Sequence, residues 1–156
     1  MTQPELTPAH RAVLDALDEE WMVRELQRLI PLPSVTGTDA ESELQNEIAG
    51  HLTDLGMEVD LLKLDLEALQ AEPDYPGTEA ERAEGYGVVG VTPGEGEVGF
   101  ILQGHIDVVP TGDLGQWTGG EPFSGDIVGD VLHGRGACDM KAGVVANMAV
   151  ARVTAE

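Results

Sequence analysis

An apolar stretch that ends in a histidine and an aspartate constrains this chain more than any other feature. Residues 98–109 read VGFILQGHIDVV, with successive apolar residues from Phe100 to Leu102. A strand that is apolar at successive positions is typical of a sheet covered on both faces, as in α/β proteins. The run is much shorter than the roughly 18 residues that a membrane span needs. We therefore expect a buried strand over residues 98–109.

The remaining sequence predicts helices and shorter strands around this segment. Thr7 is the expected cap of one helix over residues 8–30, and a second helix is expected to begin after Thr38 and end at Gly56. Thr38 and Glu41 have the spacing of a capping box. We further expect strands at 57–65, 87–91 and 127–134, a helical turn at 66–70, loops at 71–86 and 110–126, and a final helix at 144–153. This order predicts an α/β fold with a mixed sheet and flanking helices.

The charge balance narrows the range of partners. Eight basic residues stand against 29 acidic ones, a formal net charge of −21. Nucleic acids and anionic membranes need positive surface, so neither is expected as a partner. The first ten residues lack the pattern of a signal peptide, and the single cysteine, Cys138, excludes an internal disulfide, so we expect a cytoplasmic protein. Abundant acids with two lysines also suit a salt-adapted source, a hypothesis that stands beside an ordinary acidic cytoplasmic protein.

His105 and Asp107 form the first candidate site. Residues two apart on a strand point to the same face, so the two side chains are expected side by side at a strand end. Neutral imidazole is a good zinc ligand, and a nearby carboxylate can hold the ring. The same spacing also fits a polar pair that is merely exposed at a strand end, and the spacing alone does not decide between the two.

Asp139 is the second candidate, within the stretch GRGACDMKAG at residues 134–143. It lies just before the predicted final helix, between small residues that let backbones approach closely. A carboxylate placed there can bridge two metal ions through its two oxygens. It also fits an ordinary helix N-cap, which is common for aspartate.

Four motifs taken together give the chain a recognisable pattern: SVTG at 34–37, GHIDVVP at 104–110, Trp117 with PFSG at 122–125, and GRGACDMKAG at 134–143. From about residue 20 onward the chain resembles the zinc amidohydrolases related to acetylornithine deacetylase, succinyl-diaminopimelate desuccinylase, carboxypeptidase G and aminoacylase. The resemblance implies a zinc-peptidase-like catalytic domain and an enzyme that hydrolyses amide bonds of N-acyl amino acids or small peptides.

The resemblance also implies a role for each candidate residue. His105 would bind one zinc ion, Asp107 would orient and polarise that histidine as a catalytic residue, and Asp139 would bridge two zinc ions, with cobalt or manganese as alternatives. The peptide bond between Asp139 and Met140 would be cis. The full-length enzymes of this kind also suggest a homodimer. Cys138 is more simply explained as a small packed residue than as a ligand.

The chain departs from the family pattern after Asp139. The Glu-Glu pair that supplies the general base and a zinc ligand is absent there, since the only later acid is Glu156. We therefore expect residues 1–156 to be the N-terminal part of an incomplete catalytic domain, without the lid or dimerisation domain, and inactive alone. Two alternatives stay open: a non-catalytic binding or interaction module that keeps the fold, and a protein that binds one metal ion through His105 and Asp139.

Overall fold

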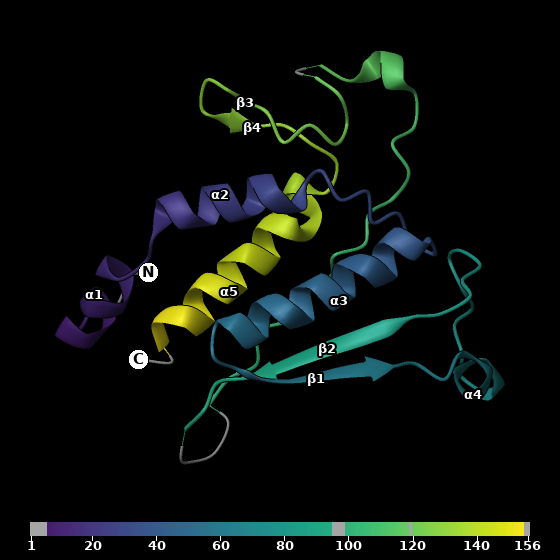
Figure 1. Cartoon of the computed structure of the whole chain (residues 1–156), viewed down its shortest axis with the longest axis horizontal. Coiled ribbons are helices and arrows are strands. Elements are labelled where there is room, and N and C mark those ends of the chain that lie inside the picture. The colour runs from purple at the N-terminus through teal and green to yellow at the C-terminus, as the bar shows by residue number, and fades with distance from the viewer. Residues whose placement is uncertain (1–5, 95–98, 119, 155–156) are drawn as a thin grey trace, which may run out of the picture.

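A computed structural model of the chain describes residues 6–94, 99–118 and 120–154. Within the described residues, five α-helices, two antiparallel pairs of strands and two short non-α helical turns follow one another along the chain (Figure 1). Their bounds are α1 Pro8–Asp15, α2 Glu19–Leu29, α3 Asp39–Asp54, β1 Glu58–Lys63, α4 Leu66–Ala71, β2 Tyr86–Val91, η1 Leu114–Gln116, β3 Ile127–Val128, β4 Val131–Leu132, η2 Ala137–Lys141 and α5 Ala142–Thr154. Helices and small sheets occur together, which confirms the predicted α/β class.

The predicted helix over residues 8–30 is two helices, so this expectation was wrong in its extent. Thr7 caps α1 as expected, because its side chain accepts a hydrogen bond from the His10 N–H. Asp18 then adopts an extended backbone, and its carboxylate accepts from the Trp21 N–H at 2.9 Å. An aspartate that satisfies a free N–H in this way starts a new helix. The sequence therefore contains a second cap where we expected a continuous apolar face.

Helix α3 has the predicted bounds but not the predicted capping box. The Thr38 hydroxyl donates to the Val35 carbonyl at 2.7 Å and makes no cap bond to the helix. Glu41 accepts instead from the Gly37 N–H at 2.6 Å and from Arg82 at 2.8 Å. Thr38 and Glu41 have the spacing of a capping box, but the carboxylate of Glu41 is bound by Gly37 in the preceding turn and by Arg82 in a distant loop. Glu41 thereby connects the turn at Gly37 to the loop that contains Arg82.

Strands β1 and β2 form an antiparallel hairpin that covers one side of α3 (Figure 1). Glu58 pairs with Val91 and Lys63 pairs with Tyr86. The connection between the strands carries the predicted helical turn as α4 and the predicted polar loop. The strand expected over 127–134 is a tighter hairpin of β3 and β4, because Gly129, with φ of +61°, turns the chain in its middle.

The long buried strand predicted over 98–109 is not formed in the described residues, which exclude residue 98. Residues 99–107 belong to no strand, and a single parallel bridge joins Val108 to Val35. Phe100 and Ile101 are 60% and 85% exposed. A strand is held by hydrogen bonds to neighbouring strands, and the described residues offer this segment only the one bridge. The apolar pattern of the segment does not show whether neighbouring strands are present to bind it.

The core lies where α2, α3 and α5 meet. It is made of buried aliphatic side chains from these helices together with one residue of the GHIDVVP stretch: Leu29, Leu44, Ile48, Ile106, Val144, Val145 and Met148. In Figure 1, α5 runs between α2 and α3. Ile106 is 4% exposed and anchors the residues on either side of it, which are two of the three candidate site residues, His105 and Asp107. The core therefore fixes the position of the site.

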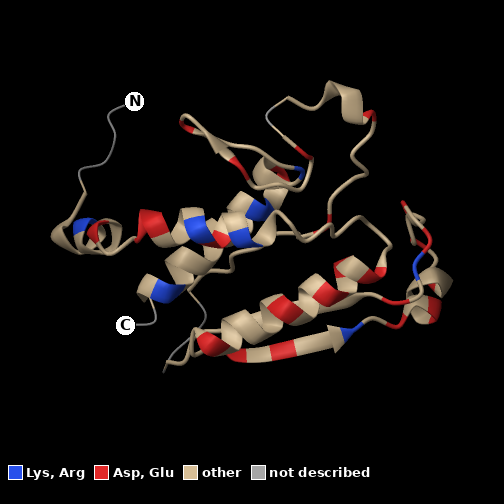
Figure 2. Cartoon of the chain, turned by 45° about the horizontal axis from the view of Figure 1, so that its top comes forward, with Lys and Arg blue, Asp and Glu red and all other residues tan. Residues whose placement is uncertain are grey.

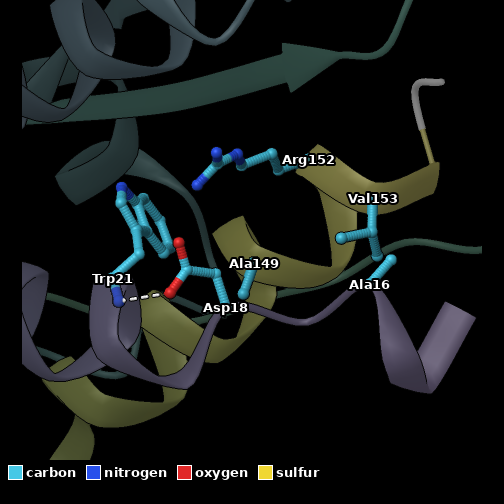
Figure 3. A pocket seen from close by; sticks show the side chains of 6 residues that line it. All are labelled: Ala16, Asp18, Trp21, Ala149, Arg152 and Val153. Carbon is cyan, nitrogen blue, oxygen red and sulfur yellow. Dashed lines mark hydrogen bonds between the residues drawn. The ribbon is translucent and has the colours of Figure 1, made fainter.

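The charges are spread unevenly over this framework. Figure 2 shows acidic residues along α3 and the β1–β2 hairpin, and Lys63 is the only lysine or arginine between Arg28 and Arg82. At the other side of the molecule, the Arg152 guanidinium of α5 lies over the Trp21 ring of α2 at 5.4 Å (Figure 3). This contact ties the end of α5 to the start of α2. No helix in the described part of the chain is long and apolar enough to cross a membrane.

Candidate metal centre

The GHIDVVP stretch presents its two polar side chains on the side opposite the core. Ile106 and Val108 are buried. His105, which precedes Ile106, and Asp107, which lies between the two buried residues, face outward. The His105 Nδ1 atom lies 3.2 Å from Asp107 Oδ1 and 3.1 Å from the Asp107 carbonyl oxygen. The backbone thus keeps the alternation of an extended strand, even though it forms no ladder. The predicted side-by-side arrangement of His105 and Asp107 is present.

Asp139 meets the other nitrogen of the same ring. The His105 Nε2 atom lies 3.1 Å from Asp139 Oδ1, although 34 positions separate the two residues in the sequence. The side chain of Asp139 is 88% exposed and that of His105 is 48% exposed. The imidazole therefore stands between two carboxylates, with Asp107 at Nδ1 and Asp139 at Nε2. The peptide bond between Asp139 and Met140 is cis, as expected.

Gly136 brings the GRGACDMKAG stretch against the strand-like segment. Its φ of +79° lies in the left-handed region, and a Cβ atom built on it would lie 2.4 Å from Val108 Cγ1. Only glycine combines this backbone conformation with such a close approach. The contact places η2, and with it Asp139, beside the residues that carry His105. A glycine is therefore required at position 136 of the motif, where the backbone lies against Val108.

Lys141 anchors the far end of η2 in the core. Its side chain is fully buried, and its ammonium group donates to the Leu29 carbonyl at 2.8 Å and to the Leu32 carbonyl at 2.7 Å. Burial lowers the pKa of Lys141 from 10.5 to about 8, because removal from water disfavours the charged form. The ammonium group thus binds the carbonyl of Leu29, the last residue of α2, and a carbonyl of the turn that follows, which suits the negative end of a helix. Sequence reasoning left the role of this lysine open.

Asp107 has a second partner that sequence reasoning missed. The Thr36 hydroxyl donates to Asp107 Oδ2 at 2.8 Å. Thr36 belongs to the SVTG motif, which lies beside the GHIDVVP stretch through the bridge between Val35 and Val108. The motif itself was visible in the sequence, but its contact with the aspartate depends on the tertiary pairing.

The donor set of this centre fits part of a metal site. Two ligand atoms of one tetrahedral zinc ion lie about 3.4 Å apart when each is about 2.1 Å from the metal. The 3.1 Å between His105 Nε2 and Asp139 Oδ1 is close to that separation. Within the described residues, no three such side chains are arranged so that they could hold one metal ion. Cys138 is exposed, so the expectation that it is a packed residue was wrong. Imidazole and carboxylate are donors that zinc accepts, so the pair fits as two ligands of a larger set.

The comparisons with known proteins agree with this geometry. Residues 101–156, which include the whole centre, match the model of peptidase family M20/M25/M40. Over these residues the chain is similar to this family. Members of peptidase family M20/M25/M40 are hydrolases and are generally metal-dependent, and the resemblance drawn from the four motifs is confirmed.

Similar proteins extend the match toward the N-terminus. Succinyl-diaminopimelate desuccinylase from Rhizorhabdus wittichii is 39% identical over 125 residues, which are 80% of this chain and 28% of that protein. The desuccinylase from Stenotrophomonas maltophilia is 39% identical over 119 residues, 76% of this chain and 26% of that protein. The one from Methylorubrum extorquens is 50% identical over 50 residues, 32% of this chain and 13% of that protein. The matched residues of this chain thus span between 13% and 28% of the length of these relatives.

Proposed function

We propose that this chain provides part of the metal centre of a hydrolase that cleaves amide bonds in N-acyl amino acids or small peptides. The observation that carries the proposal is the position of the His105 imidazole between two carboxylates, at 3.2 Å from Asp107 and 3.1 Å from Asp139. The succinyl-diaminopimelate desuccinylase relatives favour an N-acyl amino acid as the substrate class. A homodimer of the full-length enzyme is part of the same proposal.

Each of the three residues has one task in this proposal. The His105 Nε2 atom and a carboxylate oxygen of Asp139 are the metal ligands, and the second oxygen of Asp139 is free to reach a second ion. Asp107 faces the Nδ1–H group of His105 and accepts its hydrogen bond, which leaves the lone pair of Nε2 available for the metal. A carboxylate in this place keeps a metal-binding histidine in one tautomer and raises its basicity.

The metal of this proposal is zinc, in two ions, with cobalt or manganese as alternatives. When bound, the metal would polarise the amide carbonyl and acidify a water molecule. The formal net charge of −21 on the whole chain also favours a cation over an anion as its ligand. We further propose that the remaining ligands and the general base come from residues outside this chain, since the described residues supply two ligands and the curated relatives are several times longer.

Metal binding and hydrolysis test the proposal separately. Zinc content after dialysis is measured for the complete protein that contains this chain, together with hydrolysis of N-succinyl and N-acetyl amino acids and of dipeptides. We expect bound zinc and hydrolysis of at least one N-acyl amino acid. His105→Gln and Asp139→Ala are expected to lose zinc and activity together, because each removes a ligand. A complete protein that hydrolyses these substrates equally well with and without both ligands would refute the proposal.

A matched control distinguishes ligand loss from loss of a histidine in general. His10 is exposed on α1, where it accepts from the Thr7 N–H, and we expect His10→Gln to keep zinc and activity. The chain of 156 residues is tested beside the complete protein and is expected to be inactive alone. Metal-free complete protein with no hydrolysis of any amide substrate would instead support a non-catalytic binding module. One zinc ion per chain would support the single-metal alternative.

A further inference from the structure

The Asp107 carboxylate is held from both sides. One oxygen lies 3.2 Å from His105 Nδ1, and the other accepts a hydrogen bond from the Thr36 hydroxyl at 2.8 Å. Asp107 is half-buried, with 30% of its side chain exposed. A hydroxyl that donates to a carboxylate makes a charge-assisted bond, which is stronger than a bond between neutral groups. The direction in which Asp107 points therefore depends on Thr36 as well as on the histidine.

The backbone that carries Thr36 is fixed relative to Asp107. The Thr36 N–H donates to the Val108 carbonyl at 3.1 Å, and the Val108 N–H donates to the Ser34 carbonyl at 2.9 Å. Ser34 is fully buried, and its hydroxyl donates to the Ile106 carbonyl at 2.7 Å. These three bonds connect the SVTG motif to the residues on both sides of Asp107. The distance from the threonine to the aspartate thus cannot drift without breaking them.

A second set of contacts holds the same turn from its outer side. The Gly37 N–H donates to Glu41, and the other carboxylate oxygen of Glu41 accepts from Arg82 at 2.8 Å. Gly37 has φ of +85°, and a Cβ atom on it would lie 2.6 Å from the Glu81 carbonyl oxygen. The polar loop between α4 and β2 is therefore packed against the turn that presents Thr36. The loop thus holds Gly37 and Glu41, and Gly37 follows directly after the threonine that contacts Asp107.

We propose that Thr36 is a positioning residue whose hydroxyl holds the Asp107 carboxylate against the Nδ1 side of His105. Its consequence for metal affinity rests on the proposed function, whereas its effect on the direction of Asp107 does not. Loss of a hydrogen-bonding partner behind a metal ligand typically lowers metal affinity by about 10- to 100-fold. Thr36 acts on the ligand His105 only through Asp107, so we expect a loss at the lower end of this range, about 10-fold, when the hydroxyl is removed.

Three variants separate the hydroxyl from other properties of the residue. Thr36→Val keeps the shape of the side chain and removes the hydroxyl, and Thr36→Ser keeps the hydroxyl. Thr38→Val is the matched control, because the Thr38 hydroxyl donates within the same turn, to the Val35 carbonyl, and does not contact Asp107. Circular dichroism checks that each variant is folded, and Thr36→Ala replaces Thr36→Val if valine is not tolerated.

Two measurements on these variants test the proposal. The first is the set of three-bond NMR couplings from the Asp107 carboxyl carbon to the backbone, which report its χ1 rotamer in metal-free protein. We expect one rotamer in the parent, in Thr36→Ser and in Thr38→Val, and averaged couplings in Thr36→Val. The second is zinc affinity, measured by competition with a coloured chelator, which should fall only in Thr36→Val.

The possible results are distinguishable. Unchanged Asp107 couplings in Thr36→Val would overturn the positioning role, whatever the zinc affinity. Averaged couplings in Thr36→Val together with a parent protein that binds no zinc would support the positioning role and contradict the proposed function. Averaged couplings in Thr38→Val as well would overturn the inference, because the effect would then belong to the whole turn and not to the hydroxyl of Thr36.

Discussion

Replacement of Gly136 by alanine tests how the two halves of the centre are brought together. The left-handed φ of +79° costs an alanine about 1–2 kcal/mol relative to its preferred backbone. The new Cβ atom would also lie 2.4 Å from Val108 Cγ1. Val108 is 3% exposed and β-branched, so its side chain has few other rotamers to adopt. Overpacking of this kind costs about 1–3 kcal/mol.

Gly129 provides the matched control for this variant. It has a similar φ of +61°, but a Cβ atom on it would meet nothing within 4 Å. We therefore expect Gly129→Ala to lower the free energy of unfolding by about 1–2 kcal/mol, from the backbone alone. We expect Gly136→Ala to lower it by about 2–5 kcal/mol, from the backbone and the clash together. The difference between the two variants isolates the close approach to Val108.

Urea unfolding of the parent and both variants measures this difference, with the signal followed by circular dichroism. Zinc affinity is measured in parallel, because the clash would push Asp139 away from His105. We expect Gly136→Ala to weaken zinc binding and Gly129→Ala to leave it unchanged. Equal unfolding free energies for the two variants would refute the argument, since the backbone conformation is common to both and only the contact with Val108 differs.

Three further predictions follow from burial and charge. Ile106→Ala should cost about 2–5 kcal/mol of unfolding free energy, whereas Ile101→Ala, at an 85% exposed position, should change it by less than about 0.5 kcal/mol in the same urea assay. The lowered pKa of Lys141, about 8 in the folded chain against 10.5, means that the unfolded chain binds the extra proton between these values. The free energy of unfolding should therefore rise by about 3 kcal/mol from pH 8 to pH 10.5 through this group, and Lys141→Met should remove that rise. The pKa of Glu84 is lowered by its hydrogen bond with Lys63, so an NMR titration should show it return toward 4.5 in Lys63→Met, and an unchanged value would contradict the ion pair.

The sequence was sufficient for the parts of the site that depend on local geometry. Two-residue alternation places His105 and Asp107 on one side of an extended segment, and this holds even though no strand ladder forms there. That Asp139 would approach the histidine was also predicted, but from the resemblance of the GHIDVVP and GRGACDMKAG motifs to a known family and not from physical reasoning on spacing. Local periodicity contains no information about a contact between residues 34 positions apart.

The missed features depend on which partner a polar group finds. Asp18 looked like one more residue in an amphipathic helix, until its carboxylate proved to satisfy the N–H group of Trp21. Glu41 had the correct spacing for a capping box, but Gly37 and Arg82 take its oxygens. Residues 99–107 are apolar enough for a buried strand, yet a strand also needs neighbours with free backbone groups. In each case the outcome depends on which hydrogen-bonding partners the folded chain offers, and the local sequence pattern does not contain this information.

The environment of Lys141 has a practical consequence for following this protein through folding. The chain has two lysines, and the side chain of Lys63 is 63% exposed whereas Lys141 is fully buried. An amine-reactive reagent should therefore label Lys63 quickly and Lys141 only when η2 leaves the end of α2. In mass spectrometry, the labelled fraction of Lys141 relative to that of Lys63 then measures how often the candidate site opens, because Lys63 is exposed whether the site is closed or open.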